Sequence, residues 1–535
     1  MERINKIRSF FARKPILKKT IGFILLFLLI LFCFENFYYI GGRDVFSENF
    51  QTIRTLMLIV PIFSLAYGCY LKGNGKLNIK NLTFLLMITG FSLRVGYAFY
   101  TGVASRQHDV EMYNGSQLNL NGAGHFSYIY TIFSTGKLPE EIRWQFYHPP
   151  LWHATIALFM KIMQIFHPSY GVAKLFEESI VVSAFVGCVT LYAFKDLLFI
   201  LFNEDKQDIS LKNKNNILIA IVFSLLTFHS QFFIMSSWMN NESMAFMFML
   251  LTLIYGIKFH KRRKWSDIIL CGLMLGLGAT SKVSVAIICI PLGVIFTYDF
   301  VEEIKQKHLK SITLKALTFV AICLPISTWF VIRNIILFGN PSIGVPGIDP
   351  NTSSLGVIKY SFWQRFGIPN LFKGINESVF CILRPNANGY LDYNVWLYTF
   401  KCSVFGEYSY WQGELFAKIL LFFNILLALF SLFCMVFINI KDRKNKEFLK
   451  INIVMDIIYV INIFSYIVFQ ILYPVTCTQD FRYMTMILLP GTYFVGKYFI
   501  SLGSERTKNR LMKFTTLFLC IGFMISSTLY FISIR

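Results

Sequence analysis

Long apolar runs recur along the whole chain, and they constrain its fold more than any other feature of the sequence. About 20 consecutive apolar residues cross the hydrocarbon core of a bilayer. Because lipid offers no hydrogen-bond partners, such runs must form helices that satisfy their own backbone groups. The sequence therefore predicts an all-α polytopic membrane protein. Candidate spans lie at 20–40, 54–71, 82–102, 216–235, 243–259, 268–280, 282–299, 316–337, 414–438, 452–473, 481–499 and 514–532.

The composition agrees with a helical membrane protein. The chain has 535 residues, of which 55% are hydrophobic and only 15% are charged, whereas soluble domains carry about 25% charged residues. A lipid-spanning barrel would instead show short segments of alternating polarity. The first apolar run, 20–40, is too long for a signal-peptide core and lacks a small-residue cleavage site, so we expect an uncleaved span.

The net charge of +22 could indicate nucleic-acid binding, but its distribution argues against that function. Lysine and arginine cluster in short connections such as "KGNGKLNIK", "KFHKRRK" and "KDRKNK". This pattern is typical of the cytoplasmic loops of membrane proteins. The expected electrostatic partners are anionic lipid headgroups, and no nucleic-acid partner is expected.

The positions of the basic loops give a topology. With the N-terminus inside, 103–149 lies outside and the basic loop 204–215 lies inside, so an odd number of crossings must separate them. Two apolar runs, 150–166 and 176–203, lie between. Either one of them does not cross fully, or three short helices cross. We expect about 13 transmembrane helices and an outside C-terminus. The expected divisions are N-terminal spans 1–102, an outer loop with amphipathic interfacial helices 103–149, a central bundle 150–337, a second outer loop 338–413 and C-terminal helices 414–535.

The stretch "SRQHDVEMYNG", 105–115, places ionisable groups at the edge of the membrane. Asp109 follows the outer end of the third span, where a partly desolvated carboxylate can act as a general base. A single acidic residue in a loop is more often simple solvated charge. The neighbours His108 and Glu111 favour the functional interpretation.

Two further stretches combine ionisable groups with the start of an apolar run. In "FYHPPLWH" the prolines suit a helix start, and His148 stands beside it, where it could meet Asp109 or a substrate. In "CTQDFRYMT" the Arg482 guanidinium could bind phosphate in a bidentate way. It could equally pair with Asp480 or extend towards lipid headgroups.

The remaining candidates share a predicted position near the outer membrane face. Lys282 in "GLGATSKVS" could hold an anion or extend to the interface, and "SSWMNNESMA" could be only a tight polar turn. Interfacial ionisable groups are functional candidates by default. A carboxylate, basic groups and aromatic residues on one face suit a reaction between a lipid-borne phosphate and a hydroxyl. The group comprises Asp109, His148, Asn240, Asn241, Lys282, Arg333, Glu407 and Arg482.

Taken in order over about 100–490, these residues resemble a known family. The chain resembles the GT-C superfamily of polyprenyl-phosphate-sugar-dependent glycosyltransferases. Within it, the chain is similar to family 39, which includes protein O-mannosyltransferase-like and lipid A aminoarabinose transferase-like enzymes. The first acidic motif of the family is often Asp-Glu, whereas this chain has Asp109-Val110-Glu111, which leaves the role of Glu111 open. The resemblance is carried by Asp109, "YHPPLWH", "NNES", "GLGATSKVS", "WFVIRNIILFGNP" and "DFRYMTMILLP".

The resemblance implies a hexosyl or pentosyl transfer from a polyprenyl phosphate to a hydroxyl on an unknown glycan, protein or lipid. Asp109 would take the acceptor proton, with Glu111 and His148 beside it. Direct displacement with one carboxylate inverts the anomeric centre. Arg482, Tyr483, Lys282 and Arg333 would bind the donor phosphate. The implied pocket-lining residues are His108, Asn240, Asn241, Glu407 and Asp480.

No cofactor is assigned. Relatives differ in their use of a divalent metal, and Asp109, Glu111 and His148 could supply ligands, but no spacing demands one. The short loops suggest a bacterial cytoplasmic membrane with an outward-facing site, the endoplasmic reticulum being the alternative. The rival function is a transporter or flippase for a lipid-linked sugar. Transporters favour internal repeats and charges at the bilayer midplane, neither of which the sequence suggests.

Overall fold

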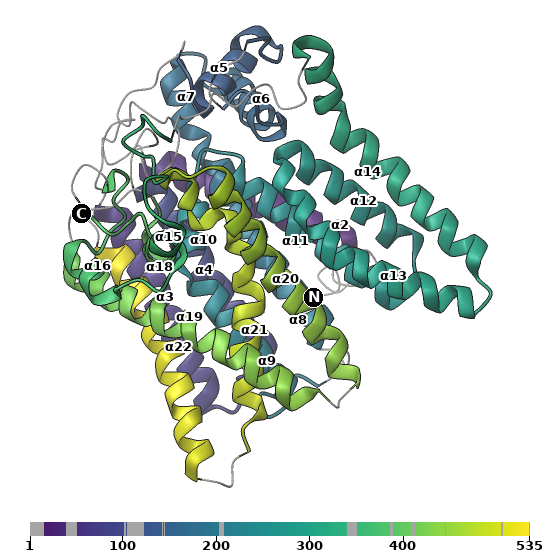
Figure 1. Cartoon of the computed structure of the whole chain (residues 1–535), viewed down its shortest axis with the longest axis vertical. Coiled ribbons are helices and arrows are strands. Elements are labelled where there is room, and N and C mark those ends of the chain that lie inside the picture. The colour runs from purple at the N-terminus through teal and green to yellow at the C-terminus, as the bar shows by residue number, and fades with distance from the viewer. Residues whose placement is uncertain are drawn as a thin grey trace, which may run out of the picture.

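The chain folds into a bundle of helices (Figure 1). The computed structural model describes residues 15–38, 51–100, 103, 122–141, 143, 145–202, 208–339, 350–385, 389–407, 413–443, 446–503 and 507–533. Within these residues the only strand-like pairing is an isolated bridge between Gly356 and Val475. The expectation of an all-α protein is therefore confirmed.

The N-terminal half contributes long helices and one group of short ones. Its elements are α2 (Pro15–Cys33), η1 (Phe34–Tyr38), α3 (Gln51–Gly73), α4 (Ile79–Tyr100), α5 (His125–Thr135), α6 (Leu151–Phe166), α7 (Val172–Glu178), α8 (Ile180–Phe202), α9 (Lys214–Phe228), α10 (Ser230–Met235) and α11 (Glu242–Arg262).

The C-terminal half continues the bundle and adds short helices between α14 and α19. Its elements are α12 (Trp265–Ser281), η3 (Val283–Ile288), α13 (Cys289–Lys305), α14 (Leu309–Phe338), α15 (Phe362–Phe366), α16 (Leu371–Glu377), α18 (Val395–Phe405), α19 (Glu414–Asp442), α20 (Lys446–Leu472), η4 (Thr476–Gln479), η5 (Phe481–Ile487), α21 (Leu488–Ser501) and α22 (Thr507–Ser533).

The described residues contain ten helices that are long and apolar enough to cross a membrane, and α6, α9 and α12 are shorter apolar helices. The chain is a multi-pass integral membrane protein. The run 172–202 is 31 residues long, whereas the 16 residues of α6 reach only about 24 Å, less than the roughly 30 Å hydrocarbon core. By length, the run 172–202 can cross the membrane, whereas α6 alone is shorter than a full crossing; which of the expected alternatives holds stays a prediction.

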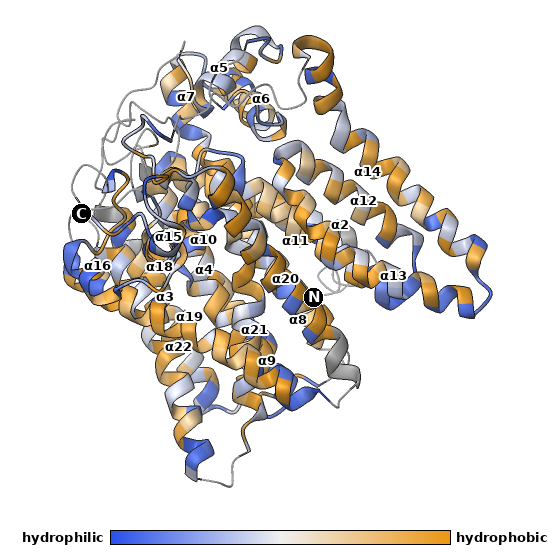
Figure 2. Ribbon diagram, in the orientation of Figure 1, coloured by the Kyte–Doolittle hydropathy of each residue, from blue (hydrophilic) through white to orange (hydrophobic). Residues whose placement is uncertain are grey.

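Apolar residues cover the shafts of the helices, and polar residues gather at their ends (Figure 2). Several large apolar side chains on α14 are more than half exposed, including Leu317 at 60% and Ile336 at 76%. Exposed apolar surface on this scale would be costly in water and suits contact with lipid.

Close packing in the bundle depends on small residues at helix contacts. α12 packs against both α11 and α14. A Cβ atom at Gly276 of α12 would lie 2.8 Å from the Ile326 side chain of α14, so only glycine allows this approach. Gly187 of α8 likewise lies against Ser236, in the turn after α10.

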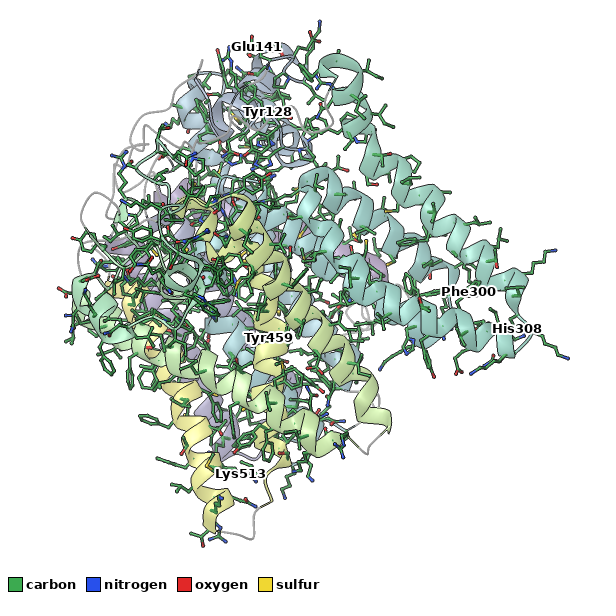
Figure 3. All side chains as sticks on the ribbon, in the orientation of Figure 1. Tyr128, Glu141, Phe300, His308, Tyr459 and Lys513 are labelled. Carbon is green, nitrogen blue, oxygen red and sulfur yellow. The ribbon has the colours of Figure 1, made fainter. Side chains whose placement is uncertain are left out.

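One end of the bundle carries the elements that form the candidate site. α5, α6 and α7 gather at the top of Figure 1, and Figure 3 places Tyr128 and Glu141 at this end and Lys513 at the opposite end. Hydrogen bonds from Val357 N to Pro474 O and from Thr476 N to Leu355 O, both 2.9 Å, attach the segment after 350 to the turn after α20. The turn that leads to η4 and η5 is thereby held against a second segment.

Candidate functional site

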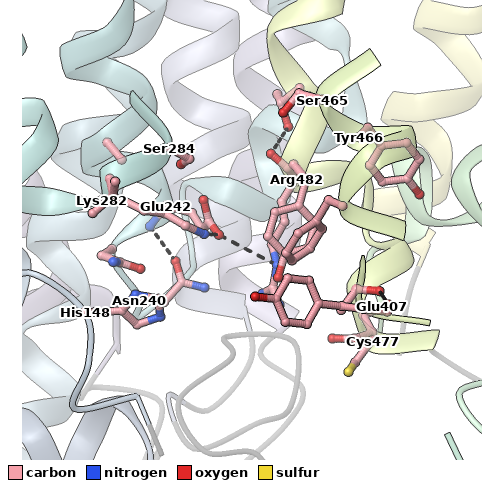
Figure 4. A pocket seen from close by; sticks show the side chains of 18 of the residues that line it. His148, Asn240, Glu242, Lys282, Ser284, Glu407, Ser465, Tyr466, Cys477 and Arg482 are labelled. Carbon is pink, nitrogen blue, oxygen red and sulfur yellow. Dashed lines mark hydrogen bonds and ion pairs between the residues drawn. The ribbon is translucent and has the colours of Figure 1, made fainter. Parts of the chain in front are cut away.

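A cavity of about 1090 Å³ opens at this end of the bundle. Its walls come from α11, η3, the end of α20, and η4 and η5, together with residues 145–148 and parts of 350–407. The cavity brings together seven of the predicted site residues, several of which Figure 4 shows converging. These are His148, Asn240, Asn241, Lys282, Glu407, Arg482 and Tyr483.

Three charged side chains form the polar centre of the cavity. The Oε1 atom of Glu242 forms an ion pair with the Lys282 ammonium and lies 3.8 Å from the Nε atom of Arg482 (Figure 4). These side chains are only 11–14% exposed. Lys282 and Arg482 thus share one carboxylate in a sheltered position, where an anion that enters the cavity can contact both cations.

The ring of Tyr483 lies beside both cations. The Lys282 Nζ atom is 5.0 Å from the ring centroid, and the Arg482 Cζ atom is 5.3 Å from it. Both contacts are within the range of cation–π attraction. Tyr483 therefore helps to hold the two cations on one wall of the cavity.

The "NNES" stretch explains how Glu242 comes to face Lys282. The Asn240 Oδ1 atom accepts a hydrogen bond from Glu242 N at 2.9 Å, and Asn241 Nδ2 donates to Ser281 O at 2.8 Å. The first bond fixes the start of α11, and the second joins it to the end of α12. Lys282 has extended backbone angles and ends α12, so its side chain leaves the helix beside Glu242.

Asp480 positions Arg482. Its Oδ1 atom accepts a hydrogen bond from Arg482 N at 2.9 Å and another from Cys402 Sγ at 3.2 Å. Its Oδ2 atom lies 3.5 Å from Arg482 Nε. Asp480 is 1% exposed and does not line the cavity. The salt bridge anticipated from the sequence therefore exists, and Arg482 still faces the cavity.

Three stacked histidines lie at another wall of the cavity, which His125 and His148 line. The ring of His125 lies parallel to those of His148 and His153, with centroids 5.7 Å and 5.2 Å away. Burial, together with the charges of Arg482 and Lys282, lowers the pKa of His125 to about 3. Burial, then the Lys282 charge, also holds the pKa of His148 well below its usual value. Both rings are therefore neutral at physiological pH.

The rest of the cavity is mainly apolar. Phe246 and Met249 of α11 and Ile287 of η3 line it on one side, and Phe469 and Leu472 of α20 line it on the other. Val283 and Leu472 are 59% and 66% exposed, which places apolar side chains at the rim. The cavity thus joins a cationic end to an apolar channel at the bundle surface, an arrangement that suits an amphipathic anion.

A second carboxylate lies on the cavity wall. Glu407 is 7% exposed and neighbours Cys477. Burial, with a contribution from the Glu407 charge, raises the pKa of the Cys477 thiol to about 12. Cys477 is therefore an unreactive neutral thiol, and the chemistry of this wall depends on Glu407.

The other predicted site residues lie elsewhere. His108, Asp109 and Glu111 are outside the described residues, so their expected roles, including metal ligation with His148, remain predictions. Arg333 does not line the cavity; its Nη2 atom donates to Pro139 O at 2.8 Å. It joins α14 to the segment after α5.

Sequence reasoning missed two features of the cavity. Glu242 follows Asn240 and Asn241 directly and was overlooked, although a charged residue at the start of an apolar helix is itself a signal. His125 was also missed. It stands in the aromatic stretch "HFSYIY", where nothing in the local pattern distinguishes it from the surrounding apolar residues.

Residues 147–330 match the model of the family described as dolichyl-phosphate-mannose-protein mannosyltransferase. The match confirms the resemblance to GT-C glycosyltransferases that the motifs predicted, and it indicates a membrane glycosyltransferase of the GT-C type. The matched segment includes His148, Asn240, Glu242 and Lys282, and Arg482 lies beyond it. No curated protein matches the chain.

Proposed function

We propose that this GT-C-type chain transfers a monosaccharide from a polyprenyl phosphate to a hydroxyl group of an acceptor on the outer face of the membrane. The observation that carries the proposal is the sharing of Glu242 by Lys282 and Arg482 at the polar end of a cavity with apolar walls. Such a cavity offers both a phosphate site and a path for a lipid chain.

The reaction can be written with its charges balanced. The acceptor oxygen attacks the anomeric carbon and passes its proton to a general base, for which we propose Asp109. The bond between the anomeric carbon and the phosphate oxygen breaks, and its electron pair leaves with the polyprenyl phosphate. A single displacement inverts the anomeric centre.

Lys282 and Arg482 would act on the leaving group. The phosphate carries one negative charge in the donor and gains a second as the bond breaks. Cations fixed beside it therefore bind the transition state more strongly than the ground state. Asp480 and Tyr483, which hold Arg482 in place, act as positioning residues.

The neutral histidine on the cavity wall is better suited to hydrogen bonding than to acting as the general base. His148 lines the cavity with a strongly lowered pKa. A base this weak takes up a proton poorly at neutral pH. We therefore propose that His148 forms a hydrogen bond to the sugar or the acceptor, and that a carboxylate acts as the general base.

The phosphate site can be tested by binding of polyprenyl phosphate without a sugar to purified protein in nanodiscs. Arg482→Gln and Lys282→Gln should each weaken binding about tenfold or more, since each removes a charge-assisted hydrogen bond. Lys373→Gln, at an exposed lysine on α16, is the matched control and should bind as wild type does. Equal affinities for all four proteins would refute the phosphate site.

Transfer and transport can be separated with the same preparation. Wild-type protein in proteoliposomes is offered radiolabelled polyprenyl-phosphate sugars and a membrane extract as acceptor source. The proposal expects label on the acceptor and its loss in Arg482→Gln. Movement of labelled lipid across the bilayer without transfer would establish the flippase function instead.

A further inference from the structure

Away from the cavity, three ionisable side chains meet where η1, the end of α6 and the end of α7 come together. Glu35 belongs to η1, His167 ends α6, and Glu178 ends α7. One potential ligand atom from each lies within 4.8 Å of the other two. Because α6 begins three residues after His148 and its 16 residues span about 24 Å, the cluster at its other end lies far from His148.

The carboxylate of Glu178 is buried beside that of Glu35. Its side chain is 0% exposed, and among the described residues its oxygens have no hydrogen-bond partner other than the carboxyl group of Glu35. The Glu35 Oε1 atom is buried and has no further partner there either. A buried carboxylate must either take up a proton or have its charge compensated, for example by a metal ion. Lys174 is a nearby cation, but its ammonium lies over the Tyr170 ring, 4.0 Å from the centroid.

We infer that Glu35, His167 and Glu178 bind a divalent transition-metal ion of the Zn²⁺ class. The His167 Nε2 atom lies 3.8 Å from both Glu35 Oε1 and Glu178 Oε1. Tetrahedral ligands at about 2.0–2.2 Å from Zn²⁺ stand roughly 3.3–3.6 Å apart, so small side-chain movements complete the site. Carboxylate oxygens and imidazole nitrogens are both ligands that this ion takes.

The same ligands argue against the hard cations. Mg²⁺ and Ca²⁺ take six or more oxygen ligands, whereas an imidazole nitrogen favours Zn²⁺ and its neighbours. The His167 and Glu35 side chains are 28% and 27% exposed, so water can reach a fourth position. The Tyr170 ring stacks on His167 with centroids 4.5 Å apart and fixes the plane of the imidazole.

The position of the site gives the ion a structural role. It would join η1, the continuation of the first span, to the α6–α7 turn. Since α6 starts beside His148, this joint steadies one wall of the cavity from its far end. The inference concerns a separate site and stands whether or not the proposed transferase function is correct.

The test is Zn²⁺ binding to full-length protein that has been stripped with EDTA and desalted. Calorimetric titration should give one tight site per chain in wild type, and Mg²⁺ at millimolar concentration should not compete. Glu178→Gln and His167→Gln should each weaken binding by about 100-fold or more, because each removes a direct ligand. His308→Gln, at a histidine whose side chain is 62% exposed, is the matched control and should bind as wild type does.

Two further measurements keep the inference open to refutation. Co²⁺ bound to wild type should show the visible absorption of a low-coordinate site, and His167→Gln should abolish it. Thermal unfolding reports whether each variant is folded. If wild type binds no Zn²⁺, the two carboxyl groups share a proton and no metal site exists. If both variants bind Zn²⁺ as wild type does, the ion occupies some other surface site, which also overturns the inference.

Discussion

Replacing Glu242 with glutamine should destabilise the unliganded protein and strengthen its binding of polyprenyl phosphate. Glutamine keeps the shape of the side chain and removes the charge that Lys282 and Arg482 share. Without that charge, two cations with 12% and 14% exposed side chains lie side by side on one wall of the cavity, and only Arg482 keeps a carboxylate, that of Asp480. A bound phosphate would then relieve their repulsion without competing with a carboxylate.

The distances set the size of both effects. At an effective dielectric constant of about 20, a pair separated by 3.8 Å, as Glu242 and Arg482 are, attracts by about 4 kcal/mol. Partial exposure and the cost of desolvation reduce the net value, so we expect a loss of about 1–3 kcal/mol in unfolding free energy. A phosphate bound to the cations, about 7 Å from Glu242, would be repelled by the Glu242 charge by about 2 kcal/mol. Removing that charge should therefore tighten phosphate binding about tenfold or more.

The assay is thermal unfolding and polyprenyl phosphate binding of wild type and Glu242→Gln in nanodiscs. Glu414→Gln, at an exposed glutamate that pairs with Lys418, is the matched control and should change neither quantity. Glu242→Gln should unfold at a lower temperature alone and recover most of the loss when the lipid is bound. Weaker binding in this variant would refute the reasoning, because Glu242 would then be needed to hold the cations in place.

Two further predictions concern buried charge. Lys401 and Asp392 form an ion pair of 2.6 Å, and both side chains are 1% exposed. Lys401→Met should lower the unfolding free energy by about 3–5 kcal/mol in denaturant unfolding, whereas the double variant with Asp392→Leu should recover most of this loss. Equal losses in the single and the double variant would contradict the prediction. His125 is 3% exposed, and its pKa is lowered to about 3 in the folded protein. Below about pH 6.5 the His125 ring therefore binds a proton in the unfolded chain but not in the folded protein. Stability should therefore fall by about 2 kcal/mol between pH 7.5 and pH 5, and His125→Gln should remove this part of the loss in thermal unfolding; an unchanged pH dependence would show that the ring is not held neutral.

Hydropathy predicted the membrane helices because the free-energy cost of placing polar groups in lipid depends only on the residues within each apolar run. It did not predict where helical geometry changes within a run. The predicted span 282–299 begins with the 3-10 turn η3 after the extended residue Lys282. The predicted span 481–499 begins with η5, and α21 starts only at Leu488. These breaks expose Lys282 and Arg482 to the cavity, and neither changes the hydropathy of its run.

The candidate site was predicted as a set of residues, without its contacts. Lys282 and Arg482 were recognisable as cations at the ends of apolar runs. Their common partner Glu242 was not recognisable, because it lies 40 residues from Lys282 and 240 residues from Arg482 in the sequence. Only the packing of α11, α12 and η5 brings the three side chains together. The stack of His125, His148 and His153 depends on α5 lying against α6, which is likewise a tertiary contact.

The central claim is that the chain is a transferase whose general base is Asp109. The most direct measurement is sugar transfer from radiolabelled polyprenyl-phosphate donors by wild type and Asp109→Asn in lipid, with polyprenyl phosphate binding measured alongside. The account predicts that Asp109→Asn binds the lipid as wild type does and transfers about 100-fold more slowly or worse. Transfer at the wild-type rate by a variant with intact binding would contradict it.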